Sequence, residues 1–214
     1  MNVNIQRHAI VVRLSHWLMA LSILVLIGSG WRIYNSAPIF PFTFPEQFTL
    51  GGDVDAALAR HNDPGVATAI AWHFAAMWGL LLAFLAFVLW GALSGHFRRD
   101  FLPVRPAEVW HDLIAALTFR LDHRLGHYNA VQKLLYWAAM LGAGLMLLSG
   151  IAIWKPVQTY PLEALFGGFQ GARIVHFLVM TGLVLFLVVH VALVILVPKT
   201  LRAMITGSAT ENRP

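Results

Sequence analysis

Residues 173–192 read R-I-V-H-F-L-V-M-T-G-L-V-L-F-L-V-V-H-V-A, and this stretch decides the fold. It is apolar over most of its length and carries two histidines, His176 and His190, which are 14 residues apart. Fourteen residues make nearly four helical turns, so both rings are predicted on one face of a helix. With a rise of about 1.5 Å per residue, the rings lie roughly 21 Å apart along the axis. That separation suits two sites and is too long for one shared metal centre.

The chain contains four apolar runs that are long enough to cross a lipid bilayer as helices: residues 14–34, 69–93, 132–154 and 173–197. A hydrocarbon core of ~30 Å needs about 20 helical residues. The composition, 58% hydrophobic and 12% charged, leaves too little polar surface for a soluble domain of 214 residues. We predict an all-α, integral membrane four-helix bundle, with residues 1–214 as a single domain. The first run has no cleavage site after it and is expected to remain as an anchor.

The distribution of Lys and Arg predicts how the bundle is oriented. Eleven of these residues lie in 1–13, 94–133 and 198–214, whereas four lie on the other side of the spans. The positive-inside rule then places both termini and the middle loop in the cytoplasm. The net charge of +5 is therefore interpreted as a topology signal, and no nucleic-acid partner is expected.

Three segments connect the spans. Residues 35–68 are rich in Pro, Phe and Gly and are predicted to form an ordered cap on the outer face. Residues 96–128 carry apolar side chains at helical spacing and predict an amphipathic helix on the cytoplasmic surface. Residues 155–172 are expected to form a turn-rich connection.

Four histidines lie within the spans, where ionisable groups are costly and face a partner or serve a function. The first span rises from the cytoplasm and the second and fourth descend, so depth pairs His16 with His190 and His73 with His176. Two facing neutral imidazoles form the ligand set of a low-spin haem iron without an open site. The chain has no cysteine, which excludes thiolate-held clusters and covalent c-type haem. We therefore predict two non-covalent b haems.

Other interpretations of these residues remain open. The histidines also fit packing roles with hydrogen bonds to carbonyl groups, and a zinc or iron site would need three or four converging ligands. Several glycines in the spans can make room for a flat macrocycle or serve as ordinary helix contacts, namely Gly28, Gly30, Gly79, Gly142, Gly144 and Gly150.

The motifs around these histidines resemble those of the bacterial di-haem cytochrome b superfamily. This group includes cytochrome b561, the b-type subunit of Ni,Fe-hydrogenases, the gamma subunit of formate dehydrogenase and thiosulfate-reductase-type subunits. The matching segments are R-L-S-H-W (13–17), A-W-H-F (71–74), R-I-V-H-F (173–177), V-V-H-V (188–191) and N-A-V-Q-K (129–133). K-P-V-Q (155–158) and F-G-G-F-Q-G-A-R (166–173) are most similar to the thiosulfate-reductase type, which is often associated with molybdopterin oxidoreductases.

The resemblance implies roles for five residues. His16, His73, His176 and His190 would ligate the two haem irons, in the pairs that depth predicts. Asn129 occupies the position of a quinone contact in formate dehydrogenase gamma subunits, although Val131 replaces a glycine of that motif; a helix cap is an equal alternative for Asn129. Position alone predicts three further contacts. Arg173, one turn before His176, would bind a haem propionate or snorkel to the interface, and Arg32 and Lys155 at the outer ends of spans are candidates for the same role. His127 is a candidate proton relay to a quinone.

The resemblance further implies a multi-pass protein of the bacterial inner membrane, surrounded by lipid. It would transfer electrons between the quinone pool and a periplasmic redox partner through the inner and the outer haem in turn. The direction of electron flow is open. Two alternatives are a stand-alone quinone oxidoreductase that uses a small diffusible reductant, and a non-redox anchor or transporter.

Overall fold

The computed structural model describes residues 2–6, 9–51, 64–118, 129–196 and 198–212. The long helices are α1 (Ile10–Ser36), α3 (Pro64–Leu93), α5 (Ala130–Trp154) and α7 (Gly168–Leu196). The shorter elements are β1 (Asn2–Gln6), η1 (Glu46–Phe48), η2 (Phe97–Phe101), α4 (Pro106–Leu117), α6 (Tyr160–Leu165), α8 (Pro198–Thr206) and β2 (Ser208–Asn212).

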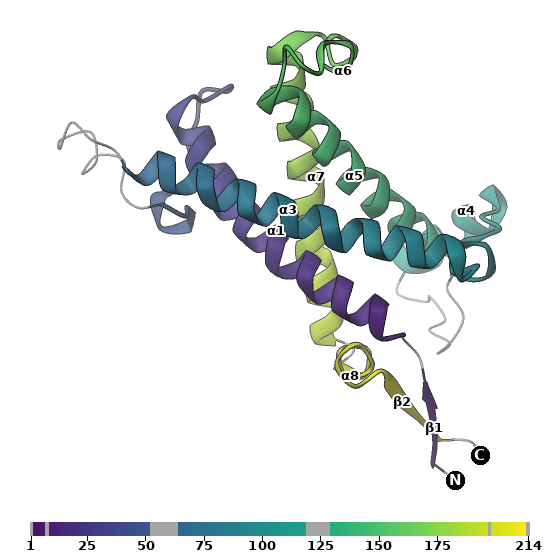
Figure 1. Cartoon of the computed structure of the whole chain (residues 1–214). Helices are drawn as coiled ribbons and strands as arrows, with labels where there is room; N and C mark the ends of the chain where they lie inside the picture. The colour runs from purple at the N-terminus through teal and green to yellow at the C-terminus, as the bar shows by residue number, and fades with distance from the viewer. Residues whose placement is uncertain (1, 7–8, 52–63, 119–128, 197, 213–214) are drawn as a thin grey trace.

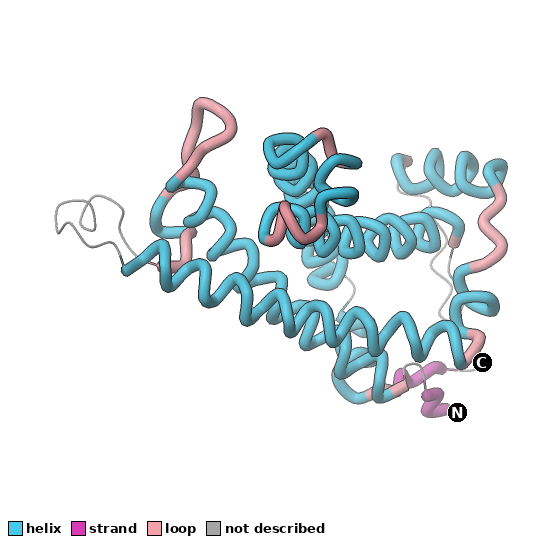
Figure 2. The backbone as a smooth tube through the Cα atoms, turned by 45° about the horizontal axis from the view of Figure 1, so that its top comes forward, coloured by secondary structure: helices cyan, strands magenta, loops and turns pink. Residues whose placement is uncertain are grey.

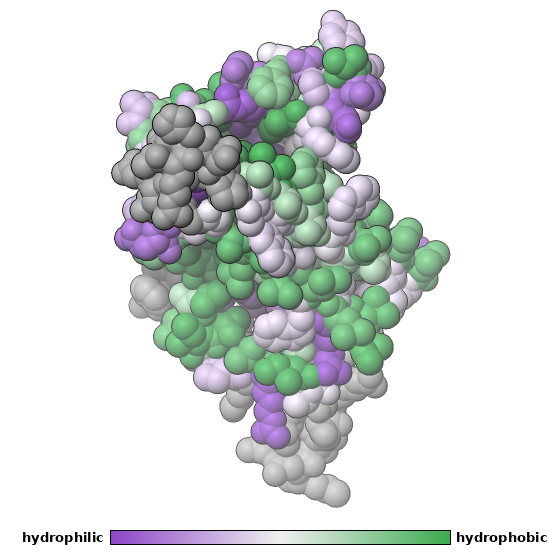
Figure 3. Space-filling model, turned by 60° about the vertical axis from the view of Figure 1, so that its left-hand side comes forward, coloured by the Kyte–Doolittle hydropathy of each residue, from purple (hydrophilic) through white to green (hydrophobic). Residues whose placement is uncertain are grey.

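The four long helices are apolar enough to cross a membrane, which confirms the predicted membrane bundle. The helices begin earlier than the apolar runs; α7, for example, begins at Gly168, ahead of the predicted start at residue 173. Large apolar side chains remain exposed along their lengths, as for Leu82, Leu141 and Leu185. Figure 3 shows apolar side chains gathered across the middle of one face, with many of the hydrophilic residues above them. This surface suits hydrocarbon as its solvent.

The long helices form two antiparallel pairs. α1 packs closely along α3, and α5 packs along α7. Figure 2 shows the α1–α3 pair running beneath the α5–α7 pair. Direct packing between the pairs is sparse within the described residues, and α3 touches α5 only locally. The space between the pairs is where the histidines of the spans meet.

An aromatic cap closes one end of the bundle, in agreement with the prediction for the described part of residues 35–68. The Tyr34 hydroxyl donates to the Phe40 carbonyl at 3.3 Å and accepts from the Phe40 amide at 3.2 Å. Asn35 makes two hydrogen bonds to the backbone of Phe44, at 2.8 and 2.9 Å. Phe177 of α7 packs against Tyr34 and Phe40, with ring centroids 5.1 and 5.3 Å apart. The cap thus joins the end of α1 to α7; residues 52–63 lie outside the described part.

The opposite end of the bundle carries α4, α8 and the paired strands. The predicted amphipathic helix is present as α4, which covers Pro106–Leu117 and follows the π-helical turn η2, so within the described part of residues 96–128 it begins later than predicted. Pro103 lies in the non-helical stretch before α4, and Pro106 is the first residue of α4, because proline lacks the amide proton that a helix interior needs and constrains the residue before it. The exposed side chains of Trp110 and Ile114 suit an interface with lipid. Residues 119–128 lie outside the described part.

Four short elements were not predicted from the sequence. α6 replaces part of the turn-rich connection, and α8 begins at Pro198, two residues after the end of α7 at Leu196. β1 and β2 pair antiparallel, so the two ends of the chain lie together, as Figure 1 shows.

A tight glycine turn connects α6 to α7. Gly167 and Gly168 have φ values of 82° and 86°, a left-handed conformation that favours glycine. Three residues on, a Cβ on Gly171 would overlap the carbonyl oxygen and carbon of Phe166. Backbone atoms cannot rotate away as the end of a side chain can, so this junction requires a glycine.

We expect Gly171→Ala to destabilise the protein by on the order of 1–3 kcal/mol, the usual cost of overpacking. A lower melting temperature of the purified protein in detergent would show it. Gly182→Ala on the same helix is the matched control, since a Cβ there meets nothing within 4 Å. Equal melting temperatures for the two variants would contradict the steric assignment.

Candidate functional site

The structure brings the four histidines of the spans together as two facing pairs. The ring centroids of His16 on α1 and His190 on α7 are 6.2 Å apart, with 54° between the ring planes. Those of His73 on α3 and His176 on α7 are 6.5 Å apart, with 56° between the planes. These are the pairs that depth predicts. Helix α7 contributes one ring to each pair, while α1 and α3 contribute one each.

The spacing within each pair fits two axial ligands of one iron. A metal–imidazole bond is about 2.0 Å long and a ring nitrogen lies about 1.1 Å from its ring centre, so coaxial ligands have centroids roughly 6 Å apart. Both pairs meet this value. Among the described residues, no group of three or more potential metal-binding side chains is found. The geometry therefore suits a metal whose remaining ligands come from a macrocycle, as in haem.

The rings of the pair nearer the aromatic cap are hydrogen-bonded to two serines that the sequence analysis missed. Ser29 Oγ lies 3.0 Å from His73 Nδ1, and Ser149 Oγ lies 2.9 Å from His176 Nδ1. Both serines are fully buried. The sequence pattern that could have identified these serines is the dipeptide S-G, which occurs at 29–30 in the first span and at 149–150 in the third.

Aromatic rings surround the other pair. Trp17 meets His16 edge-on at 5.3 Å, and Phe186 stacks on His190 at 5.8 Å. Next to His16, the Trp17 indole donates to the Met204 carbonyl of α8 at 3.4 Å. Arg13 also donates to the carbonyls of Met204 and Ile205, so α8 is fastened to the first turns of α1.

Two arginines lie near the end of the bundle that carries the cap. The Arg173 guanidinium donates to the Ala37 carbonyl and to Gln170 Oε1, so it links α7 to the end of α1. Its predicted contact with a propionate stays a prediction. Arg32 is fully buried and lies three residues after Ser29, on the same side of α1. The predicted contact of Arg32 with a propionate also stays a prediction.

Asn129 caps helix α5. Its side-chain oxygen accepts from the Gln132 amide at 2.8 Å, and Gln132 Oε1 accepts from the Asn129 amide at 3.2 Å. Asp112 of α4 accepts from the Ala130 amide at 2.8 Å, which fastens α4 to α5. The helix-cap interpretation is therefore confirmed. It leaves the amide nitrogen of the Asn129 side chain as a donor, so the quinone contact stays a prediction.

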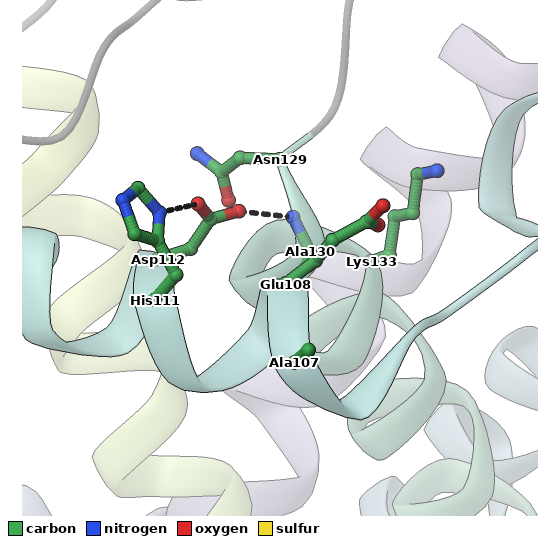
Figure 4. Close-up of a pocket in the computed structure, with 7 residues that line it drawn as sticks. All are labelled: Ala107, Glu108, His111, Asp112, Asn129, Ala130 and Lys133. Atoms are coloured by element: carbon green, nitrogen blue, oxygen red, sulfur yellow. Dashed lines mark hydrogen bonds and ion pairs between the residues drawn. The ribbon is translucent and has the colours of Figure 1, made fainter.

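A cavity of about 450 Å³ opens beside this cap. Figure 4 shows His111, Asp112 and Asn129 toward one side and Glu108 and Lys133 toward the other. His111 Nδ1 lies 3.2 Å from Asp112 Oδ1. The predicted relay residue His127 lies outside the described part of the chain.

Comparisons with known proteins identify relatives along most of the chain. The family described as prokaryotic cytochrome b561 matches residues 7–207. A relative from Azospira oryzae, named as a protein-methionine-sulfoxide reductase subunit, is 42% identical over 197 residues, which cover 92% of this chain and 93% of the relative. A Ni/Fe-hydrogenase b-type cytochrome subunit from Azotobacter vinelandii is 29% identical over 201 residues, 86% of this chain and 77% of the relative.

A shorter match covers 40% of this chain and 40% of the cytochrome b556 subunit of Escherichia coli formate dehydrogenase, with 32% identity over 88 residues. The narrower likeness to thiosulfate-reductase-type subunits stays a prediction. Because the family match spans nearly the whole length, this chain belongs to the prokaryotic cytochrome b561 family, whose members are membrane cytochromes that bind haem b and transfer electrons with oxidoreductases.

Proposed function

We propose that this chain is a di-haem b cytochrome of the bacterial inner membrane, which transfers electrons between the quinone pool and a periplasmic redox subunit. The observation that carries the proposal is that four histidines form two pairs, and that the two imidazoles of each pair are spaced to bind one iron. His16 and His190 would hold one haem, and His73 and His176 the other. When bound, haem b supplies one-electron transfer, and two imidazoles leave its iron no open site for oxygen chemistry.

The chain's own residues set the environment of each site. The aromatic cap packs on Phe177, the residue after His176, and would limit the access of water to the pair His73–His176. Arg32 and Arg173 supply positive charge near this pair for the propionates. The positive-inside count supports placing the termini, and with them the pair His16–His190, toward the cytoplasm.

The quinone head group is proposed to bind beside the N-terminus of α5. The Asn129 side-chain amide supplies a donor to a quinone carbonyl, and the neighbouring His111–Asp112 pair can hold and release a proton. A quinone needs two protons for each two electrons that reduce it, so a protonatable pair at this depth suits the reaction.

The proposed partner is a reductase of oxidised methionine. This choice rests on the 42% identical relative, which carries the name of such a subunit and aligns over almost its whole length. Electrons would then run outward from quinol to the partner. The hydrogenase relatives favour the inward direction but are less similar. Copurification of a second subunit would distinguish this proposal from a stand-alone oxidoreductase that uses a diffusible reductant.

The ligand assignment is tested by haem quantitation on the purified chain. We expect two b haems per chain in the wild type, seen in the reduced-minus-oxidised spectrum. His73→Ala and His176→Ala should each remove one and the same haem, because they lose an axial ligand of one iron. His16→Ala and His190→Ala should each remove the other.

His111→Ala is the control for these variants, since its side chain is 83% exposed and lies outside the spans. It should retain both haems. Full haem content in His176→Ala and His190→Ala would refute the assignment, and a colourless wild-type protein would favour a non-redox anchor or transporter.

The two roles of Asn129 can be separated by substitution. Asn129→Ser keeps an oxygen that caps α5 but removes the amide donor, so its melting temperature should stay near that of the wild type. Loss of one hydrogen bond of about 1 kcal/mol should slow reduction by a quinol analogue by roughly fivefold to tenfold, measured as the rise in α-band absorbance.

Asn129→Ala removes the cap as well and should cost about 1 kcal/mol of stability. A wild-type reduction rate in Asn129→Ser would show that Asn129 acts only as a helix cap.

A further inference from the structure

Two buried serines share one local geometry in two different helices. The Ser29 hydroxyl lies 2.6 Å from the Val25 carbonyl oxygen, four residues earlier on α1. The Ser149 hydroxyl lies 2.7 Å from the Leu145 carbonyl oxygen, four residues earlier on α5. A hydroxyl carries one proton, and each serine donates it along its own helix. The remaining capacity of each serine oxygen is to accept.

This arrangement fixes the direction of the serine–histidine hydrogen bonds. Each serine oxygen can only accept, so Nδ1 of His73 and Nδ1 of His176 must be the protonated donors, at 3.0 and 2.9 Å. A neutral imidazole with a proton on Nδ1 has its lone pair on Nε2. Both rings therefore present Nε2 as a metal-binding atom, and the serine hydrogen bond at Nδ1 fixes the orientation of each ring.

A glycine follows each serine and lets the ring lie against the helix. A Cβ on Gly30 would be 3.4 Å from Cε1 of His73, and a Cβ on Gly150 would be 3.3 Å from Cε1 of His176. Such distances are tight for a side chain beside a ring. The S-G dipeptide thus provides an acceptor and a flat surface together, once on α1 and once on α5.

We propose that Ser29 and Ser149 are matched positioning residues for a single haem, and that each orients one of its two axial ligands through Nδ1. The proposal rests on the proposed function, because it requires His73 and His176 to ligate one iron. Their rings face each other at 6.5 Å, so two serines from two helix pairs act on the same metal.

The expected effect is on the reduction potential of that haem. An acceptor on Nδ1 makes the imidazole a stronger electron donor and so stabilises the oxidised iron more than the reduced iron. Removing the acceptor should favour the reduced form and raise the midpoint potential. A tenfold change in the reduction equilibrium corresponds to about 59 mV for one electron.

The test is a potentiometric titration of the purified full-length chain, followed by α-band absorbance. Ser29→Ala and Ser149→Ala should each raise the potential of the same component, the one that His176→Ala removes. The double variant should raise that potential most, and the potential of the second component should stay unchanged. Ser29→Thr and Ser149→Thr, which keep the hydroxyl, should restore the wild-type value.

Ser22→Ala is the matched control, because Ser22 is another buried serine of α1 and no hydrogen bond to a histidine is found for it among the described residues. If an alanine variant fails to fold, Ser29→Cys and Ser149→Cys replace it, since sulfur is a weaker acceptor of similar size. The cysteine variants should raise the midpoint potential of the same component by less than the alanine variants do.

Shifts of different components in the two serine variants would overturn the proposal, as would unshifted or lowered potentials, or an equal shift in Ser22→Ala. A wild-type chain without two b-haem components would instead contradict the proposed function itself. Loss of the haem in an alanine variant supports the proposal if both variants lose the same component, and overturns it if they lose different ones.

Discussion

The close approach of imidazole rings from different helices, in two tilted pairs, is the constraint on which the rest of the structure depends. α7 carries one ring of each pair, whereas α1 and α3 each supply the opposite ring of one. Since direct packing between the helix pairs is sparse in the described chain, the region where the rings meet is also where the two halves of the bundle join. A cofactor between the rings would add the contacts that side chains alone do not make there.

The distribution of polarity follows from the solvent. Large apolar side chains face outward along the spans, while the most buried side chains include Ser29, Ser149 and Arg32. In water this arrangement would be unfavourable, because apolar surface would be exposed and polar groups would lose their hydration. In lipid the outside must be apolar, so polar side chains collect between the helices, where each can find a partner.

Hydropathy and helical spacing predict much of this architecture, because both are local properties of the sequence. The spans and the pairing of the histidines follow from run length, the 14-residue spacing on α7 and the alternating direction of the helices. Contacts between residues far apart in the sequence were not predictable in this way. The serine acceptors lie 44 and 27 residues from their histidines, and the burial of Arg32 depends on how its neighbours pack. α6 and the paired strands were missed because short elements leave weak periodic signals.

The attachment of α8 has a consequence for biogenesis. The Met204 carbonyl accepts from Arg13 and Trp17, and the Ile205 carbonyl accepts from Arg13; these two donors lie on either side of His16, at the opposite end of the sequence. The hydrogen bonds between α8 and α1 can form only after all four spans have been synthesised. The chain up to His176, which includes Ser29, His73 and Ser149, is synthesised before α8. During insertion, the site beneath the cap can therefore mature first, and the site near α8 is the last to be secured.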